Sequence, residues 1–262
     1  MRTAAARERE NRMLTLKGLV IRESDRGEAS KSISILTAER GIVNVFIRGG
    51  KKSSKNASPS ALFAYSVFCL EEKKNVSQQV YYLNSCESVK LFYNIRLDAV
   101  KMALGMYFCE LLGYIATEET VSDEVLRLAL NTLYSLDTDR MDMELLRAVF
   151  EFRLLCETGF RPALLGCAEC MKSESDMMYL DIASGSMLCQ NCYEDKGEQN
   201  IVEADRTMLY TIRFVALAEY DRLFSFKLSP KYLSQLTSFT SRFMRYHVRG
   251  ELKTLRFYKM LK

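Results

Sequence analysis

Hydrophobic and polar residues alternate with a period of two over much of the first ninety positions, which is typical of β-strands with one buried face. Five runs carry this pattern or are rich in β-forming residues: 13–22, 32–36, 41–50, 61–72 and 78–89. Turn-forming stretches separate the runs, and no long helical segment lies between them. Five short strands in succession predict a small closed barrel, for which a five-stranded OB-type β-barrel is the simplest arrangement.

After residue 90 the period changes to that of α-helices. The apolar positions predict helices over 92–115, 122–136, 142–159, 203–220 and 230–248. Ser122 and Asp142 are the expected N-caps, and Gly159 is the expected C-terminal stop. The pattern therefore predicts an α+β protein with a barrel domain over 1–90 and a helical bundle over 91–262. A cysteine-rich insert at about 163–197 interrupts the bundle.

Four of the eight cysteines form two C-x-x-C pairs, with eighteen residues between the pairs: Cys167, Cys170, Cys189 and Cys192. Two residues between cysteines allow a tight knuckle that directs both sulfurs to one point, and two knuckles complete a tetrahedron. The segment between them predicts a hairpin, with MMYLDI as one strand, ASGS as the turn and MLC as the return. The pattern favours a zinc ribbon-like insert with one structural zinc per chain.

Two other interpretations of these cysteines remain open, a redox dithiol and unmetallated core cysteines. A redox dithiol needs only one C-x-x-C pair, so it leaves the duplication unexplained. Four thiolates also fill every position around a tetrahedral metal, which indicates a structural metal and not a catalytic one. The remaining cysteines fall on apolar strand or helix positions and are predicted to be small core residues: Cys69, Cys86, Cys109 and Cys156.

Charge is distributed unevenly along the chain, although the net charge is only +4. Residues 1–80 hold fifteen Lys and Arg against eight Asp and Glu, and residues 240–262 hold seven against one. The cysteine-rich segment is acidic, which argues against its being a nucleic-acid finger. Two basic ends around a more acidic middle indicate a polyanionic partner, with plain solvated surfaces as the alternative.

The basic ends supply the candidate DNA-binding residues. The segment RGGKKSSK leaves the third predicted strand, and its small residues let phosphates approach the backbone closely. The candidates are Arg48, Lys51, Lys52 and Lys55 in this loop and Arg242, Arg245 and Arg249 near the C-terminus. OB barrels combine such cations with aromatic faces; Phe46, Phe63, Tyr65, Tyr81 and Tyr82 are the aromatic candidates, of which at least half are expected in the core.

Catalytic motifs are missing from the sequence. The single histidine, His247, has no evident nucleophile beside it, so a structural or phosphate-facing role is favoured. The residues before Lys51 do not have the glycine spacing of a phosphate-binding P-loop. We therefore expect a protein that is not an enzyme. No apolar run approaches the length of a membrane span, and the N-terminus lacks the apolar segment of an export signal, so we expect a cytoplasmic protein.

Three sequence segments together resemble the RecO recombination mediator family. The first comprises ESD at 23–25, Thr37, Glu39 and Gly41, followed by Arg48 and Gly49. The second is FRLLCETGFRPALLGCAEC with the later CQNC, and the third is FMRYHVRGELKTLRF. The resemblance covers essentially the whole chain, and the combination is far more specific than any single segment.

This resemblance implies a bacterial, nucleoid-associated DNA repair protein without catalytic turnover. Proteins of this family bind single- and double-stranded DNA and anneal complementary strands coated by single-strand-binding protein. They act with RecR, contact the C-terminal tail of single-strand-binding protein, and so indirectly serve the RecA recombinase. The alternatives from other classes are a zinc-stabilised protein-interaction adaptor without direct DNA binding and a nucleic-acid-processing enzyme.

Overall fold

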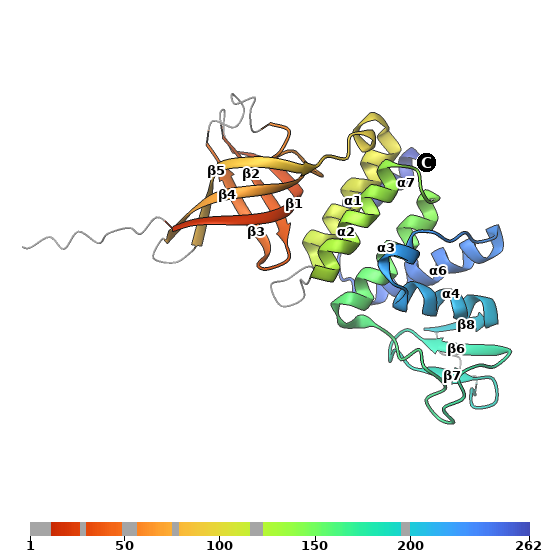
Figure 1. The fold of residues 1–262 in the computed structure, drawn as a ribbon. Helices are drawn as coiled ribbons and strands as arrows, with labels where there is room; N and C mark the ends of the chain where they lie inside the picture. The colour runs from red at the N-terminus through yellow and green to blue at the C-terminus, as the bar shows by residue number, and fades with distance from the viewer. Residues whose placement is uncertain (1–11, 27–29, 49–56, 75–78, 116–122, 195–199) are drawn as a thin grey trace, which may run out of the picture. The chain divides into compact units, whose positions relative to one another are not determined.

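The computed structural model describes residues 12–26, 30–48, 57–74, 79–115, 123–194 and 200–262. It is a mixed α+β structure in which a five-stranded sheet comes first and helices follow (Figure 1). Contacts between Cα atoms divide the chain into one unit of residues 1–93 and 109–126 and a second unit of residues 94–108 and 127–262. The predicted α+β class is confirmed, and the domain boundary at residue 90 stays a prediction.

The N-terminal sheet closes on itself. Its strands are β1 (Arg12–Arg26), β2 (Ser30–Thr37), β3 (Gly41–Ile47), β4 (Tyr65–Lys74) and β5 (Gln79–Lys90). The strand order is β1-β2-β3-β5-β4, and β4 pairs with β1 to complete the ring. The β3–β5 pair is parallel, and the other pairs are antiparallel. This order is consistent with an OB-type barrel, and the five predicted strands are confirmed with shifted ends.

The barrel core follows from the alternation of side chains along each strand. Val43, Val45 and Ile47 of β3 point inward, and Phe46 between them is only half-buried. Gly18 of β1 allows a close approach of β2, because a Cβ there would lie 3.1 Å from the Thr37 side chain. Alternate positions therefore fill the barrel, and the intervening positions of the same strands face outward.

Seven α-helices lie in the described part of the chain after the barrel. They are α1 (Ala99–Ile115), α2 (Asp123–Asp137), α3 (Met143–Leu155), α4 (Arg206–Leu217), α5 (Tyr220–Leu223), α6 (Pro230–His247) and α7 (Lys253–Leu261). A 3-10 turn η1 (Asn94–Leu97) precedes α1, and a π turn η2 (Cys156–Phe160) follows α3. None of the helices in the described segments combines the length and apolar character needed to cross a membrane.

Two predicted helix starts were wrong, and in each case an aspartate N-cap sets the true start. The helix expected from residue 92 begins at Ala99, because the Asp98 carboxylate accepts the N–H groups of Val100 and Lys101. The helix expected from residue 203 begins at Arg206, because Asp205 accepts the N–H of Met208. The preceding residues form strand β8 (Ile201–Asp205).

The other predicted helix ends have mixed outcomes. Asp142 is confirmed as the N-cap of α3, since it accepts the N–H groups of Glu144 and Leu145. Gly159 adopts a φ of +99° within η2, where α3 has already ended. Ser122 lies outside the described residues. Helices α5 and α7 were not predicted.

Helix α3 is the centre of the helical unit, since every residue from Leu145 to Leu155 is buried. Its Arg147 pairs with Glu151 at 2.7 Å and with Glu144 at 2.9 Å, and the hydroxyl of Tyr107 also donates to Glu151. Further along, the Phe152 ring packs against Phe239 and Phe243 of α6. Buried charges on this helix are therefore matched by partners that fix the neighbouring elements.

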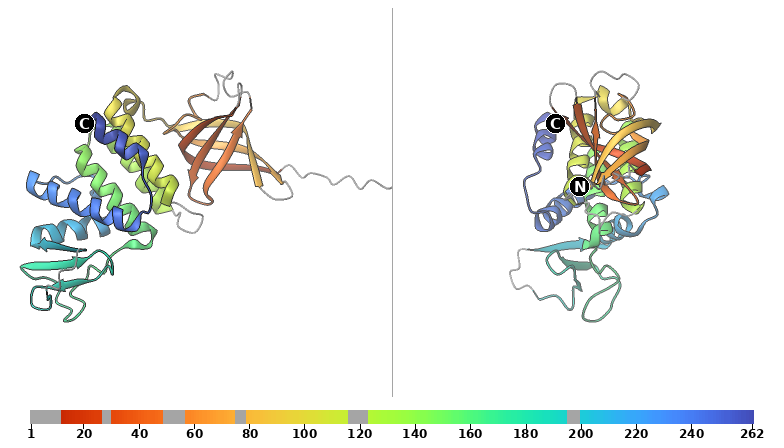
Figure 2. Two further views of the ribbon diagram at one scale, coloured as in Figure 1. Left: turned by 180° about the vertical axis from the view of Figure 1, so that it is seen from behind. Right: turned by 90° about the vertical axis from the view of Figure 1, so that its left-hand side faces the viewer.

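A second, three-stranded sheet lies beside α4 in the helical unit (Figure 2). Its order is β7-β6-β8, with β6 (Met177–Asp181) paired antiparallel to both β7 (Met187–Cys189) and β8. The Asp181 carboxylate accepts the N–H groups of Ala183 and Ser184, which forms the turn between β6 and β7. The predicted hairpin is confirmed, and β8 is an additional strand.

The C-terminal helix α7 is attached to α3 through one carboxylate. Tyr258 is the buried residue of α7, and its hydroxyl donates to Glu144 at 2.7 Å. The Lys262 ammonium lies 2.9 Å from the same carboxylate. Burial by itself would raise the pKa of Glu144, but Lys262, Arg147 and Tyr258 outweigh it and lower the pKa from 4.5 to about 2.

We expect the stabilising effect of Glu144 to be complete above pH 4.5 and to disappear as the pH falls toward 2, because its pKa is lower in the folded protein. Thermal unfolding by circular dichroism should show a lower midpoint for Glu144→Gln than for the wild type at neutral pH. The difference should shrink from pH 4.5 to pH 2. Glu203→Gln, at an exposed position of β8, is the control. A difference that stays constant over this range would contradict the role of Glu144.

Candidate metal centre and nucleic-acid interface

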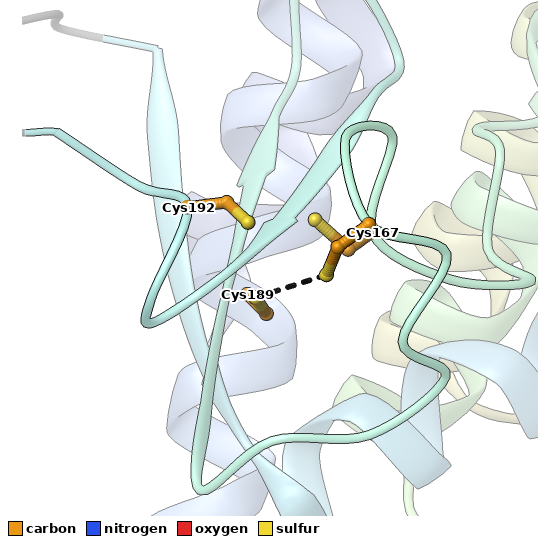
Figure 3. A group of neighbouring side chains, drawn as sticks. Cys167, Cys189 and Cys192 are labelled. Atoms are coloured by element: carbon orange, nitrogen blue, oxygen red, sulfur yellow. Dashed lines mark hydrogen bonds between the residues drawn. The ribbon is translucent and has the colours of Figure 1, made fainter.

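The four cysteines of the two C-x-x-C pairs converge on one point. Cys167 and Cys170 lie in the loop between η2 and β6, Cys189 ends β7, and Cys192 lies in the turn that follows. Their sulfur atoms all lie within 4.8 Å of one another. Figure 3 shows the side chains of Cys167, Cys189 and Cys192 directed toward a common centre. The structure thus brings together all four residues that the sequence proposes as metal ligands.

The spacing of the sulfurs fits a tetrahedral thiolate site. A zinc–sulfur bond of about 2.3 Å gives a tetrahedron with sulfur–sulfur edges of about 3.8 Å. The sulfurs of Cys170 and Cys189, which belong to different knuckles, are 3.7 Å apart. Tetrahedral sets of four sulfurs are typical of zinc or of iron bound to sulfur. The cluster can therefore hold one such metal ion without rearrangement of the fold.

The first knuckle is built by backbone hydrogen bonds and a close approach at Gly166. The N–H of Cys167 donates to the carbonyl of Lys172, and the N–H of Met171 donates to the carbonyl of Cys167. A Cβ at Gly166 would lie only 2.8 Å from the carbonyl oxygen of Met171. The knuckle therefore requires glycine at this position.

The second knuckle is closed in the same way and is held against the sheet. The N–H groups of Cys192 and Tyr193 both donate to the carbonyl of Cys189. The ring of Tyr193 stacks on Tyr179 of β6, with centroids 3.8 Å apart. This stacking holds the turn that carries Cys192 beside strand β6.

Arg213 of α4 connects the first knuckle to the helices, and the sequence analysis missed this residue. Its Nε donates to the carbonyl of Leu164 at 2.8 Å, and its terminal nitrogen donates to the carbonyls of Leu165 and Ser173. Nothing in the local sequence marks Arg213, because its partners lie forty or more residues earlier.

The thiols of the cluster differ in their pKa values. Burial opposes ionisation of Cys167, but the backbone N–H groups of Cys170, Cys189 and Glu169 outweigh it and lower its pKa to about 6. Hydrogen bonds with the Cys170 and Cys189 thiols raise the pKa of Cys192 to about 12. A metal ion that binds all four sulfurs must displace the remaining protons, so its affinity should increase with pH.

A second candidate site lies on the outside of the barrel, where β3 and β5 pair. Phe46 and Tyr82 are at paired positions of these strands, and their ring centroids are 5.8 Å apart. The guanidinium of Arg48 lies 4.1 Å from the centre of the Tyr82 ring, and the Lys73 ammonium lies 5.5 Å from it. We call these four residues the β3–β5 cluster. It combines partly exposed aromatic rings with two cations.

The structure separates the five aromatic candidates into different roles. Phe63 and Tyr81 belong to the buried core, and Tyr65 is half-buried without a cation beside its ring among the described contacts. Phe46 and Tyr82 remain as outward-facing rings. Lys73 was not among the predicted residues, because only the pairing of β4 with β5 brings it near Tyr82.

The predicted DNA-binding cations lie in different environments. Arg48 is exposed apart from its contact with Tyr82, and Lys51, Lys52 and Lys55 lie outside the described residues. Arg242 donates to the carbonyl of Ile201 in β8, so it has a structural partner. Arg245 and Arg249 are exposed. DNA binding by these residues stays a prediction.

The single histidine and the cysteines outside the cluster have packing roles. His247 lies among the rings of Phe160, Phe243 and Tyr246, and burial lowers its pKa. Cys109 and Cys156 are buried, as predicted. Cys69 of β4 and Cys86 of β5 are only half-buried, but Cys86 still packs against the barrel core, so the core prediction was wrong only for Cys69.

Comparison with known proteins finds family models for both parts of the chain, the five-stranded sheet and the helices that follow it. A family model described as "Recombination protein O N terminal" matches residues 12–92, and one described as "Recombination protein O C terminal" matches residues 96–256. With its α+β fold and four-cysteine cluster, the chain thus matches a class of recombination proteins. The chain belongs to the RecO family.

Curated relatives cover nearly the full length of the chain. The DNA repair protein RecO of Acetivibrio thermocellus is 30% identical over 251 residues, which cover 95% of this chain and 97% of the relative. That of Caldicellulosiruptor saccharolyticus is 24% identical and covers 96% of this chain and 100% of its own length. That of Dehalococcoides mccartyi is 27% identical, and the match covers 84% of this chain and 85% of the relative. Family membership supports a role in DNA repair and recombination.

We expect Gly166→Ala to lower the stability of the cysteine module, because the added Cβ would press on the Met171 carbonyl at 2.8 Å. Overpacking of this kind costs about 1–3 kcal/mol. Urea unfolding followed by the fluorescence of the tyrosines should report the loss. Gly113→Ala is the matched control, because its Cβ would meet only Ile21 at 4.0 Å and alanine favours the helix. Equal midpoints for the two variants would contradict the close approach at Gly166.

Proposed function

We propose that this protein is a recombinational DNA repair mediator. It binds single- and double-stranded DNA, anneals complementary strands and, with RecR, helps to load the RecA recombinase onto DNA coated by single-strand-binding protein. The C-terminal tail of single-strand-binding protein is its docking partner. Membership of the RecO family supports this proposal, since that family has DNA and the recombination machinery as its general partners.

The β3–β5 cluster is the observation that carries direct DNA binding. Unpaired bases stack on aromatic side chains, and cations beside the rings hold the phosphates. Phe46 and Tyr82 face outward on neighbouring strands, and Arg48 is the first residue of the basic loop predicted to bind phosphates. A pair of outward-facing aromatic rings with adjacent cations fits single-stranded DNA better than an acidic peptide, because each base can supply a ring for stacking.

We propose zinc as the metal of the four-cysteine centre, with one ion per chain. The 3.7 Å separation between Cys170 and Cys189 supports a closed tetrahedral site of four thiolates. With no open position for water or substrate, the zinc would stabilise the module by on the order of 10 kcal/mol and take no part in chemistry. The protein would act without catalytic turnover, as a cytoplasmic protein associated with the nucleoid.

We expect Tyr82→Ala to weaken the binding of a single-stranded oligonucleotide by about 5- to 150-fold, since loss of one stacking ring costs about 1–3 kcal/mol. Phe46→Ala should have a similar effect, and Arg48→Ala should also reduce the dependence of affinity on salt concentration. Fluorescence anisotropy over a range of salt concentrations measures both quantities.

Val89→Ala is the matched control for this experiment, because Val89 is an exposed residue of the same strand β5. It should bind like the wild type. Unchanged affinity of Tyr82→Ala and Phe46→Ala would remove the β3–β5 cluster from the DNA site. A wild-type chain with no salt-sensitive affinity below the micromolar range would instead favour the alternative function, a zinc-stabilised protein-interaction adaptor without direct DNA binding.

We expect elemental analysis of the purified chain to find about one zinc per molecule. Cys167→Ser combined with Cys189→Ser should abolish this zinc and lower the thermal midpoint, because both residues are buried ligands of the proposed site. Cys69→Ser, at a half-buried position outside the cluster, should retain the metal. Iron in place of zinc would correct the identity of the proposed metal. A wild-type protein that is fully stable without metal would refute the proposed metal centre.

A further inference from the structure

The four cysteines differ in their exposure to solvent. Cys167 and Cys189, the first residue of each knuckle, are 0% and 1% exposed. Cys192 is partly exposed, and Cys170 is exposed. Cys170 is therefore the most exposed cysteine of the centre, and a small dissolved molecule reaches it most readily.

We propose that the four-cysteine centre is also a site of reversible oxidative modification. A peroxide reacts at Cys170, and Cys189 then forms a disulfide with it across the two knuckles, so that the module releases its metal ion. This inference rests on the proposed metal occupancy of the centre. It adds a chemical sensitivity that a structural zinc site does not by itself imply.

The sulfur of Cys189 lies within reach of Cys170 from the other knuckle, as does that of Cys192. The sulfurs of Cys170 and Cys189 are 3.7 Å apart, although nineteen positions separate the two residues in the sequence. A disulfide bond is about 2.05 Å long, so the two sulfurs must approach each other by less than about 2 Å. Cys170 is exposed and lies in the loop between η2 and β6, outside any helix or strand.

The chemistry takes two steps and consumes one peroxide. The sulfur of Cys170 attacks a peroxide oxygen, so that a sulfur–oxygen bond forms, the oxygen–oxygen bond breaks, and the leaving oxygen takes a proton to become water. The sulfur of Cys189 then attacks the Cys170 sulfenic acid. The sulfur–sulfur bond forms, and the departing hydroxide takes a second proton to become water. Two sulfurs have together lost two electrons, and the peroxide has gained them.

The oxidised module would lose the metal but keep its two knuckles joined. The Cys170–Cys189 disulfide would replace the metal as the link between them, and the carbonyls of Leu165 and Ser173 would still accept from Arg213 of α4. Such a module should loosen without detaching from the helices. A dithiol reductant followed by metal should restore it.

The experiment uses the full chain with Cys69→Ser and Cys86→Ser, which removes the half-buried thiols outside the centre. The reduced, metal-loaded protein is titrated with hydrogen peroxide. A chromogenic chelator measures the released metal, thiols are counted after denaturation, and a non-reducing digest is mapped by mass spectrometry. We expect release of about one metal ion with loss of about two thiols, and a cross-link between the peptides of Cys170 and Cys189.

The outcomes separate this inference from the zinc proposal. A purified chain that binds no metal even when supplied with it refutes the metal centre, and the inference falls with it. A metal-loaded chain that keeps its metal and thiols, at peroxide doses that oxidise the same thiols after chelation, refutes the inference alone. A Cys167–Cys170, Cys189–Cys192 or Cys170–Cys192 cross-link in place of Cys170–Cys189 overturns the proposed pairing.

Reversibility is tested in the same preparation. Treatment with a dithiol and then zinc should return the thiol count and the metal content to their starting values. Metal loss with no disulfide, or with sulfinic acid at Cys170, would show irreversible damage and would contradict the proposal. Because these readouts are the metal, the thiols and the cross-link, they do not depend on the activity of the protein.

Discussion

The helical unit depends on the pairing of charges along α3, because that helix is buried on all sides. An unpaired arginine or glutamate inside a protein costs several kcal/mol, so each charged residue on this helix must have a fixed partner. Arg147 is held by Glu144 and Glu151, and Arg153 is held by Glu157 and by the carbonyls of Val215 and Ala218. Through these partners, the buried helix determines where the end of α4 and the C-terminal helix α7 lie.

The cysteine module is positioned by the same series of contacts. Arg153 of α3 fixes the end of α4, and Arg213 of α4 holds the loop of the first knuckle. Asp205 joins β8 to α4, and β8 pairs with β6 of the module. Contacts with the helices thus hold in place the loops and strands that carry the four sulfurs. A metal ion bound there would stabilise a shape that the hydrogen bonds already define.

The two candidate sites offer different chemistry. The β3–β5 cluster presents aromatic rings and cations on the outer wall of the barrel, which suits a nucleic-acid strand. The cysteine module belongs to an acidic segment and presents thiols of unequal exposure, which suits a structural metal and reaction with small oxidants. Binding and structural sensitivity to oxidation would therefore reside in separate units of one chain.

The sequence by itself determined the α+β class, the five strands and the metal-type spacing, because each of these is a local pattern. A period of two records which residues of a strand face the core, and C-x-x-C spacing alone allows a knuckle. The starts of α1 and α4 were missed, because a single aspartate cap overrides the apolar period. Only the tertiary structure decided that Phe46, Tyr82 and Lys73 meet on one wall of the barrel. It also decided that Arg213 supports the first knuckle, since pairing between strands and contacts between distant elements leave no trace in the local pattern of residues.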